Sequence, residues 1–436
     1  MKRSLAHSRR SNTASDWEAR TFGECAELVR DAVEPKEIES EPYIGLEHIG
    51  EGSLHLLSVG SSKQVTSLKT RFYQGDILFG KLRPYFRKIV RPLFGGVCST
   101  DIFVVRPRGS VDSRYLFYYM AQPSFVEKAS RAAEGTKMPR AKWEYLQALD
   151  IRVPPLAEQQ AIARVLGSLD DKIELNRRMN QTLEEICRAL YKFWFVDFGP
   201  VRAKLEGRWK KGKSLPGMPA DMWDLWPSEF EESEIGEIPK GWKVVRLSDR
   251  FTTQYGYTAA ASQEEIGPHL LRVTDINKSH WIDWSSVPYC SISAEELGRY
   301  SLCEGDLVVA RMADPGKAAI VEGEPSAVFA SYLVRLKNDS LARAYYTFYF
   351  LGSDSYLEYA EGARSGSVQA NMNARVIVDV PYIDPPRPIL DAFLDRVLPF
   401  RRRITANLIE DSTLATARDA LLPKLLSGEV RVKVDS

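Results

Sequence analysis

The chain of 436 residues carries the same sequence plan twice, and this repetition restricts its fold more than any other feature does. Gly75-Asp-Ile-Leu in the first half corresponds to Gly305-Asp-Leu-Val in the second half, 230 positions later. A shared order and spacing over most of each half is hard to obtain by chance, so the chain is predicted to form two related units. Further pairs keep an offset of 231: Gly135 and Gly366, Val153-Pro-Pro and Asp384-Pro-Pro, Ile173 and Ile404, Asn176 and Asn407, and Leu183 and Leu414.

Each half begins with short apolar runs separated by glycine and proline, such as residues 102–105 and 307–310, which are typical of β-strands. Helical-looking stretches follow at residues 113–131 and 341–361. A double proline then precedes a long segment with apolar residues at spacings of three, four and seven, the periodicity of a helix that buries one face. This order of elements predicts an α+β fold class for each half.

The long segments are expected to be helices over residues 156–192 and 389–422, the second ending before Pro423 because proline fits poorly inside a helix. The first, of 37 residues, would be roughly 55 Å long at about 1.5 Å per residue. Each apolar stripe needs a partner, and the simplest arrangement is an antiparallel coiled coil that joins two globular units related by a pseudo-twofold axis. Asn176 and Asn407 would be the buried polar residues that fix its register. In the alternative, each helix packs back on its own domain.

These patterns divide the chain into a flexible N-terminus at 1–15, a first domain at 16–153, a central helix at 154–198, a linker at 199–238, a second domain at 239–384, and a C-terminal helix with its tail at 385–436. The linker holds six basic residues within 202–213 and seven acidic residues within 221–237. Its prolines predict an irregular connector, and its charge runs are expected to be solvated.

Composition places limits on the class of protein. Lys and Arg number 59 and Asp and Glu 58, for a net charge of +1, so any nucleic-acid binding must come from local clusters or from a partner. The five cysteines have no metal-ligand spacing and predict no disulfide framework. Without a secretory signal or an apolar run of membrane-spanning length, the chain is expected to be soluble, cytoplasmic and not bound to a membrane.

Two segments resemble motifs of catalytic sites but lack residues that the chemistry needs. Asp314-Pro-Gly-Lys317 resembles the end of a phosphate-binding loop, but Arg311 and Ala318 replace the required Gly and Ser or Thr. Asp384-Pro-Pro-Arg387 resembles the base-holding loop of amino-methyltransferases, but lacks the aromatic residue that would stack on the base. The chain is therefore expected to be non-catalytic and to bind no metal or cofactor. A nuclease built from scattered acidic residues is the alternative, because the sequence signature of such a site is very short.

Basic residues interleaved with aromatic residues point to nucleic acid. Residues 63–92 hold eight basic residues against Asp76 alone, and residues 128–142 hold a second basic cluster. Lys and Arg neutralise phosphates, and Arg can also bind a guanine edge through two hydrogen bonds. In the second half, the amides that follow Gly366 could pair with adenine, or could simply make turns. An ordinary basic surface is the alternative.

Five longer motifs occur in order along the chain: Gly75-Asp-Ile-Leu-Phe-Gly-Lys-Leu-Arg-Pro-Tyr-Phe-Arg-Lys, Pro154-Pro-Leu-Ala-Glu-Gln-Gln, Phe195-Val-Asp-Phe-Gly-Pro-Val-Arg-Ala-Lys, Gly236-Glu-Ile-Pro-Lys-Gly-Trp-Lys and Leu422-Pro-Lys-Leu-Leu-Ser-Gly-Glu-Val. Together they resemble the specificity subunits of type I restriction–modification enzymes over nearly the whole chain. One departure is that the second repeat reads Pro385-Pro-Arg-Pro, without the Glu-Gln pair of the first.

The resemblance implies two target-recognition domains separated by two long helices, each domain reading one half of a gapped site on double-stranded DNA. It also implies that two methyltransferase subunits and two restriction subunits assemble on this chain. S-adenosylmethionine, ATP and Mg would then belong to those partners. The alternatives are a coiled-coil assembly scaffold that has lost DNA reading, and an enzyme that acts on DNA alone. The residues expected to contact DNA are Lys81, Arg83, Arg87, Lys137 and Arg140 in the first domain, and Arg311, Lys317, Arg364, Gln369 and Asn371 in the second.

Overall fold

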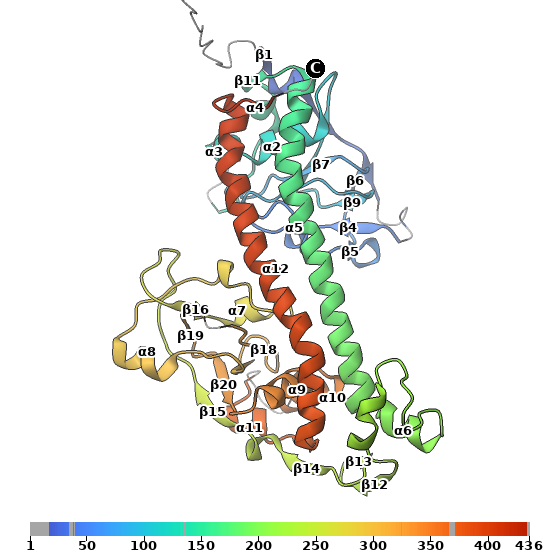
Figure 1. Ribbon diagram of the computed structural model, residues 1–436. Coiled ribbons are helices and arrows are strands. Elements are labelled where there is room, and N and C mark those ends of the chain that lie inside the picture. Colours follow the sequence, from blue (N-terminus) through green and yellow to red (C-terminus); the bar gives the residue numbers. More distant parts are fainter. Residues whose placement is uncertain are drawn as a thin grey trace, which may run out of the picture. The chain divides into compact units, whose positions relative to one another are not determined.

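The computed structural model describes residues 17–34, 38, 40–131, 133, 137–323, 325–365 and 371–433, except for the side chains of residues 364 and 365. The chain divides into two units, one made of Met1–Leu175 with Glu410–Ser436 and the other of Asn176–Ile409 (Figure 1). The expected flexible N-terminus, residues 1–15, lies outside the described residues.

A four-stranded antiparallel sheet forms the middle layer of the first unit, in the order β2-β10-β7-β8. Ile77 and Phe79 of β7 pack into the core on one face, and Leu78 packs into the core on the other face. Because both faces are covered, the strand is a continuous apolar run rather than an alternating one. The strands are β2 (Ala26–Val29), β7 (Ile77–Gly80), β8 (Ile89–Val90) and β10 (Ile102–Pro107).

Helices cover one face of this sheet and a second sheet covers the other. The second sheet has five strands in the order β3-β6-β9-β4-β5, with β4 parallel to β9. Strands β1 and β11 form a separate antiparallel pair. The remaining elements of this unit are β1 (Glu18–Thr21), α1 (Phe22–Cys25), β3 (Ala32–Val33), β4 (Pro42–Ile44), β5 (Gly60–Ser61), β6 (Lys69–Phe72), β9 (Gly96–Cys98), α2 (Ser113–Ala121), α3 (Pro123–Arg131), α4 (Trp143–Gln147) and β11 (Asp150–Val153).

The second unit repeats the four-stranded sheet and the separate strand pair, and keeps two of the five strands of the second sheet, which confirms the duplication inferred from the sequence. Its four-stranded sheet has the order β15-β20-β17-β18, the pair β14–β21 corresponds to β1–β11, and the parallel pair β16–β19 corresponds to β4–β9. The elements are β14 (Lys243–Arg246), β15 (Thr252–Tyr255), β16 (His269–Leu271), α7 (Val273–Ile276), α8 (Ala294–Tyr300), β17 (Leu307–Ala310), β18 (Ala318–Ile320), β19 (Ala327–Phe329), β20 (Leu333–Lys337), α9 (Leu341–Leu351), α10 (Asp354–Ser365), α11 (Ala374–Val378) and β21 (Pro381–Asp384).

The helical stretches expected at 113–131 and 341–361 are each a pair of helices. The side chain of Asp112 accepts hydrogen bonds from the first amides of α2, and Ser340 caps α9 in the same way. Pro123 starts α3, and Gly352 follows the end of α9. A cap and a break at matching places explain why both stretches have helical periodicity without forming one helix.

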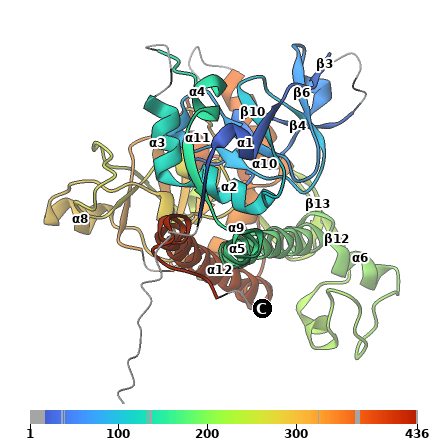
Figure 2. The same ribbon diagram turned by 90° about the horizontal axis from the view of Figure 1, so that it is seen from above.

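Two long helices, α5 (Leu156–Tyr191, 36 residues) and α12 (Arg387–Ser427, 41 residues), each contribute to both units. In the first unit Asp170 of α5 pairs with Arg418 of α12 at 2.7 Å. In the second unit Asn180 of α5 pairs with Asn407 of α12, also at 2.7 Å. A second pair in each unit, Lys172 with Glu410 and Glu184 with Arg401, shows that residue numbers fall along α12 as they rise along α5. Within each unit the two helix segments are therefore antiparallel, as expected, and lie side by side (Figure 2).

The second long helix extends further than expected, since α12 continues through Pro423 to Ser427. The prediction that it ends before Pro423 is therefore wrong. Proline inside a helix costs about 3 kcal/mol. The last turns bury Leu422, Leu425 and Leu426 in the core of the first unit, and this apolar burial offsets the cost.

The expected irregular linker is folded in part. It contains α6 (Gly199–Leu205) and the hairpin of β12 (Phe230–Ser233) and β13 (Gly236–Pro239). Trp209 and Trp226 are buried in the core of the second unit. Lys204 is not solvated as its charge run suggested: its Nζ lies 4.2 Å from the centre of the Trp223 ring, and burial lowers its pKa.

Candidate nucleic-acid interface

The loop that follows β7 is the centre of the candidate interface in the first unit. It contains a 3₁₀ turn, Pro84–Phe86, and the residues on either side of this turn, Arg83 and Arg87, have left-handed backbone with φ of 49° and 50°. Left-handed backbone is uncommon for residues other than glycine, so neighbouring contacts must hold it. The amide of Gly52 donates to the carbonyl of Phe86 at 3.2 Å and supplies one such contact.

A second basic segment pairs with this loop. The amide of Arg83 donates to the carbonyl of Pro139 at 2.8 Å, and the amide of Ala141 donates to the carbonyl of Lys81 at 2.9 Å. The guanidinium of Arg83 also reaches the carbonyl of Lys137, 54 positions along the chain. The fold therefore brings together two basic clusters that the sequence separates.

The side chains at this pairing present positive charge and an aromatic ring. Arg83, Lys137 and Arg140 are exposed, and the ring of Tyr85 is 54% exposed. Arg140 makes two hydrogen bonds to Asp101, at 2.8 and 3.3 Å, which raise the pKa of its guanidinium. This geometry leaves cations in position to neutralise phosphates or to bind base edges.

The predicted residues of the first domain do not all lie at this surface. Arg87 binds Asp419 of α12, and its side chain is only 16% exposed. Other members of the same basic run have internal partners too: Arg71 pairs with Glu41, and Lys88 donates to the carbonyl of Leu46. A run of like charges in the sequence thus separates into surface cations and structural ion pairs.

The second unit repeats the pairing at the equivalent positions. The amide of Met372 donates to the carbonyl of Arg311 at 2.9 Å, as the amide of Ala141 does to the carbonyl of Lys81. The amide of Arg311 in turn donates to the backbone carbonyl of Tyr332 at 3.0 Å, as the amide of Lys81 does to the backbone carbonyl of Asp101. Asn371 precedes Met372, so the structure brings the predicted residues Arg311 and Asn371 together.

Aromatic residues that the sequence analysis missed accompany them. The guanidinium of Arg311 lies 5.0 Å from the ring centre of Tyr255, and Tyr332 is 55% exposed. Tyr332 is found by the repeat itself, because it is 231 positions after Asp101. Exposed aromatic rings beside an arginine suit stacking on bases.

The structure does not bring the other predicted residues of the second domain, among those it describes, to the same surface. Lys317 is half-buried at the far end of the loop, where its carbonyl accepts from the amide of Ala310 at 2.8 Å. The backbone of Arg364 belongs to α10, but its side chain lies outside the described residues, as does the whole of Gln369. Their expected contacts with DNA stay predictions.

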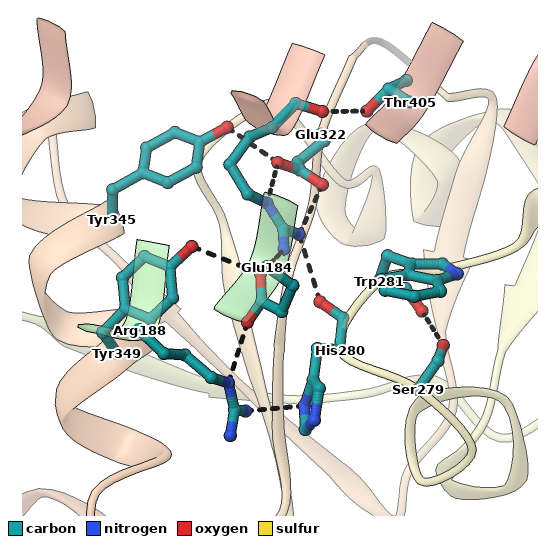
Figure 3. A network of polar contacts seen from close by, with 10 residues as sticks. Glu184, Arg188, Ser279, His280, Trp281, Glu322, Tyr345, Tyr349 and Thr405 are labelled. Atoms are coloured by element: carbon teal, nitrogen blue, oxygen red, sulfur yellow. Dashed lines mark hydrogen bonds and ion pairs between the residues drawn. The ribbon is translucent and has the colours of Figure 1, made fainter. Parts of the chain in front are cut away.

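A buried ion network joins the domain of the second unit to its helix segments (Figure 3). Arg401 of α12 is fully buried and binds Glu184 of α5 at 2.5 Å and Glu322, which follows β18, at 2.7 Å. It also donates to the carbonyl of His280 at 3.1 Å. Burial alone would lower the pKa of Arg401, but the charge of Glu322 and its hydrogen bonds outweigh that effect and raise the pKa.

The first unit has a corresponding network of opposite polarity. Asp170 of α5 accepts from Tyr118 of α2 at 2.6 Å and from Arg418 at 2.7 Å. Asp170 and Arg401 are 231 positions apart and so occupy equivalent places in the two repeats. The equivalent of Glu322 is Leu93, because the carbonyls of Pro92 and Val321, one residue earlier, accept from the amides of Gly75 and Gly305.

Both asparagines expected to fix the helix register are fully buried. The described partner of Asn407 is Asn180, whose carbonyl oxygen accepts from its amide at 2.7 Å. Asn180 lies four residues after Asn176 and was not singled out from the sequence. Asn407 and Asn180 both lie in the second unit, so their hydrogen bond joins the helix segments of that unit, and the role of Asn176 and Asn407 in helix register stays a prediction.

Asp384, in the segment that resembles a base-holding loop, makes structural ion pairs. Asp384 accepts hydrogen bonds from Arg250, at 2.9 and 2.6 Å, and from Arg343. Among the described residues, no group of three or more histidine, cysteine or acidic side chains could hold a metal ion. No helix in this part of the chain is long and apolar enough to cross a bilayer.

Comparison with known proteins finds similarity to specificity subunits of type I restriction enzymes. Residues 14–185 match the family model of the type I restriction modification DNA specificity domain. The type I restriction enzyme HindI specificity subunit of Haemophilus influenzae is 25% identical over 406 residues, 83% of this chain and 88% of that protein. The MjaIX specificity subunit of Methanocaldococcus jannaschii is 27% identical over 409 residues, 92% of this chain and 87% of that protein.

A solved structure has a similar fold. The S subunit of a type I restriction–modification system from M. genitalium aligns with a TM-score of 0.52 over 96% of this chain and 97% of its own, at 14% sequence identity. At that identity the likeness concerns the fold alone.

Proposed function

The chain is an HsdS-like specificity subunit of type I restriction–modification systems, and we propose that its two units each read one half of a bipartite, gapped DNA sequence. One observation carries this proposal: the loop after β7 and the loop after β17 pair with a second segment through equivalent hydrogen bonds. At that place the first unit presents cations with Tyr85, and the second presents Arg311, Asn371 and two tyrosines.

Different side chains on the same framework suit two different half-sites. Phosphate contacts fix the position of a protein on DNA, whereas contacts with base edges carry the sequence information. Arg83 and Arg140 match guanine in hydrogen-bonding geometry. The amide of Asn371 is of the type that pairs with adenine, but its oxygen is buried, so this loop would have to move before Asn371 could reach a base. The loops can change in composition while the sheet and helices that hold them stay the same.

We assign catalysis to partner subunits. The chain would serve a complex with two methyltransferase subunits and two restriction subunits, in which S-adenosylmethionine, ATP and Mg belong to the partners. The near-zero net charge suits this division, because partners would contact much of the DNA backbone. The cytoplasm is where such a complex would meet DNA.

The test is single-molecule mapping of DNA methylation in source cells with and without the gene. Loss of one gapped, adenine-methylated motif on deletion is the expected result, and it also identifies both half-sites. An unchanged methylation pattern in cells that express the methyltransferase would contradict the proposal and would favour an assembly scaffold that does not read DNA.

Complementation with matched variants assigns each half-site to a unit. Arg140→Ala should relax one base position of one half-site, and Arg311→Ala should relax a position of the other, each at a cost of about 1–3 kcal/mol. If both substitutions affected the same half-site, the assignment of one half-site to each unit would be wrong.

A further inference from the structure

The basic run that contains the DNA-facing loop also contains an arginine with a different environment. Arg87 donates from Nη1 and Nη2 to the two carboxylate oxygens of Asp419, at 3.3 and 3.0 Å. Its side chain is 16% exposed, whereas the neighbouring Arg83 is exposed. A guanidinium that is only 16% exposed and already bound by a carboxylate through two hydrogen bonds is poorly placed to neutralise a phosphate. Arg140 is bound by Asp101 in a similar way, but 45% of its side chain stays exposed to a ligand.

The carboxylate that binds Arg87 is itself held in place. Arg418 donates to Asp419 at 3.0 Å and to Asp170 of α5 at 2.7 Å, and its side chain is almost completely buried. Burial opposes ionisation of Asp419, but the hydrogen bonds from Arg87 and Arg418 outweigh it and lower the pKa of the carboxyl group. The contacts therefore run from the loop to α12 and from α12 to α5, all within the first unit.

Arg87 lies at the end of the turn that carries the exposed residues of the loop. It ends the turn Pro84–Phe86 in left-handed backbone, directly after the segment that carries Arg83 and Tyr85. Left-handed backbone at such a residue persists only where the surroundings hold it. Without the ion pair, the turn would lose the only described side-chain contact between Arg87 and the helix.

We propose that Arg87 is a positioning residue for DNA reading: through its ion pair with Asp419 it fixes the loop that presents Lys81, Arg83 and Tyr85. This inference rests on the proposed function, and it replaces the expectation that Arg87 contacts DNA itself. It also gives Asp419, an acidic residue on a helix, a part in sequence recognition.

Substitution of Asp419 distinguishes the two roles. If Arg87 contacted a phosphate, Asp419→Asn would remove a competing negative charge, and binding would strengthen or stay the same. If Arg87 positions the loop, Asp419→Asn and Arg87→Gln should each weaken binding to the motif, on the order of tenfold. The dependence of the logarithm of the binding constant on salt should then stay unchanged, whereas loss of one phosphate contact lowers the slope by about 0.9.

The experiment uses the assembled complex with the methyltransferase subunit and two duplexes, one carrying the motif found by methylation mapping and one with the same bases scrambled. We expect the double variant Arg87→Gln/Asp419→Asn to be no weaker than either single variant. The swapped pair Arg87→Asp/Asp419→Arg should recover much of the preference for the motif. Arg108→Gln, which removes an exposed arginine paired with Glu27 in the same unit, is the matched control and should bind like the wild type.

The outcomes separate this inference from the proposed function. Wild-type complex without preference for the motif would overturn both. Wild-type preference together with wild-type binding by Asp419→Asn, or a lowered salt slope in Arg87→Gln, would overturn the positioning role alone. Thermal unfolding and methyltransferase association of each variant distinguish a displaced loop from an unfolded unit, and the swapped pair keeps the test decisive if a single variant fails to fold.

Discussion

Arg401→Met would remove the positive charge at the centre of the buried network of the second unit while keeping a long side chain in its place. Arg401 is 0% exposed, and its partners Glu184 and Glu322 are 3% and 10% exposed. Removing one member of a buried ion pair costs about 3–5 kcal/mol, because the remaining charge is left in a poorly solvated place.

The contacts that Glu184 and Glu322 keep in the variant determine how large the loss of stability should be. Glu184 would keep Arg188 at 3.0 Å and Tyr349 at 3.3 Å, whereas the described side-chain partner left for Glu322 is Tyr345 at 2.9 Å. The destabilisation should therefore come mainly from Glu322. We expect a loss of about 3–5 kcal/mol for Arg401→Met, and adding Glu322→Gln should restore about 1–3 kcal/mol, because an amide needs no counter-charge.

Hydrogen exchange with urea is the suitable assay, because two units need not unfold together and a single transition would mix them. Amides of α9 and of the segment around His280 report on the second unit, and amides of β7 and β10 provide an internal control. Arg402→Met is the matched variant, since it removes an exposed arginine from the neighbouring position and should change stability by less than about 0.5 kcal/mol.

A loss below about 1 kcal/mol in the second unit for Arg401→Met would refute this reasoning, since that is the size expected of a solvated ion pair. A loss that Glu322→Gln does not reduce would show that packing, and not the unpaired carboxylate, is responsible.

Three further predictions concern single groups. Burial and the nearby cations, Arg188 first among them, lower the pKa of His280 to about 4, whereas an unfolded histidine titrates near 6.5. The unfolded state thus binds the proton first, so stability should fall by at most about 3 kcal/mol as the pH drops from about 6.5 to 4, and a His280→Gln variant with an identical pH profile would contradict this. Of the five cysteines only Cys303 is exposed, so a thiol reagent should modify one cysteine in the native protein and five in urea; a second fast thiol would be inconsistent. Asn407→Leu should lower the free energy of unfolding of the second unit by about 1–3 kcal/mol by leaving Asn180 without its partner. Hydrogen exchange of the second unit measures this loss, and a double variant Asn180→Leu/Asn407→Leu that is no more stable than the single variant would argue against this cause.

Elements with a local signal could be predicted from the sequence. The repeated Gly-Asp turn at Gly75 and Gly305 has φ of 88° and 87°, a backbone conformation that glycine adopts without strain, and it fixed the alignment of the two halves. The apolar periodicity after each double proline was sufficient to place α5 within one residue of its observed end. At Pro423 the local signal failed, because tertiary burial of the neighbouring leucines outweighs the cost of proline.

Which charges are buried could not be predicted. Arg401, Arg402 and Arg403 are adjacent in the sequence, yet only the first is buried, because its partners come from residues 217 and 79 positions away. The same limit applies to Arg87, whose partner is 332 positions away. Cation clusters in a sequence indicate an interface, but long-range pairing decides which of their members can reach a ligand.

The inverted charges at the equivalent positions Asp170 and Arg401 have a consequence for how such genes diversify. A recognition domain moved by recombination from the first position to the second would bring Leu93 where Glu322 stands, so the buried Arg401 would lose one of its two carboxylate partners. A domain exchanged at the second position keeps this ion pair if it carries an acidic residue at the place of Glu322. The two positions of a recognition domain in the chain are therefore no longer equivalent. New specificities should arise by replacing a domain at its own position, not by transposing domains within one gene.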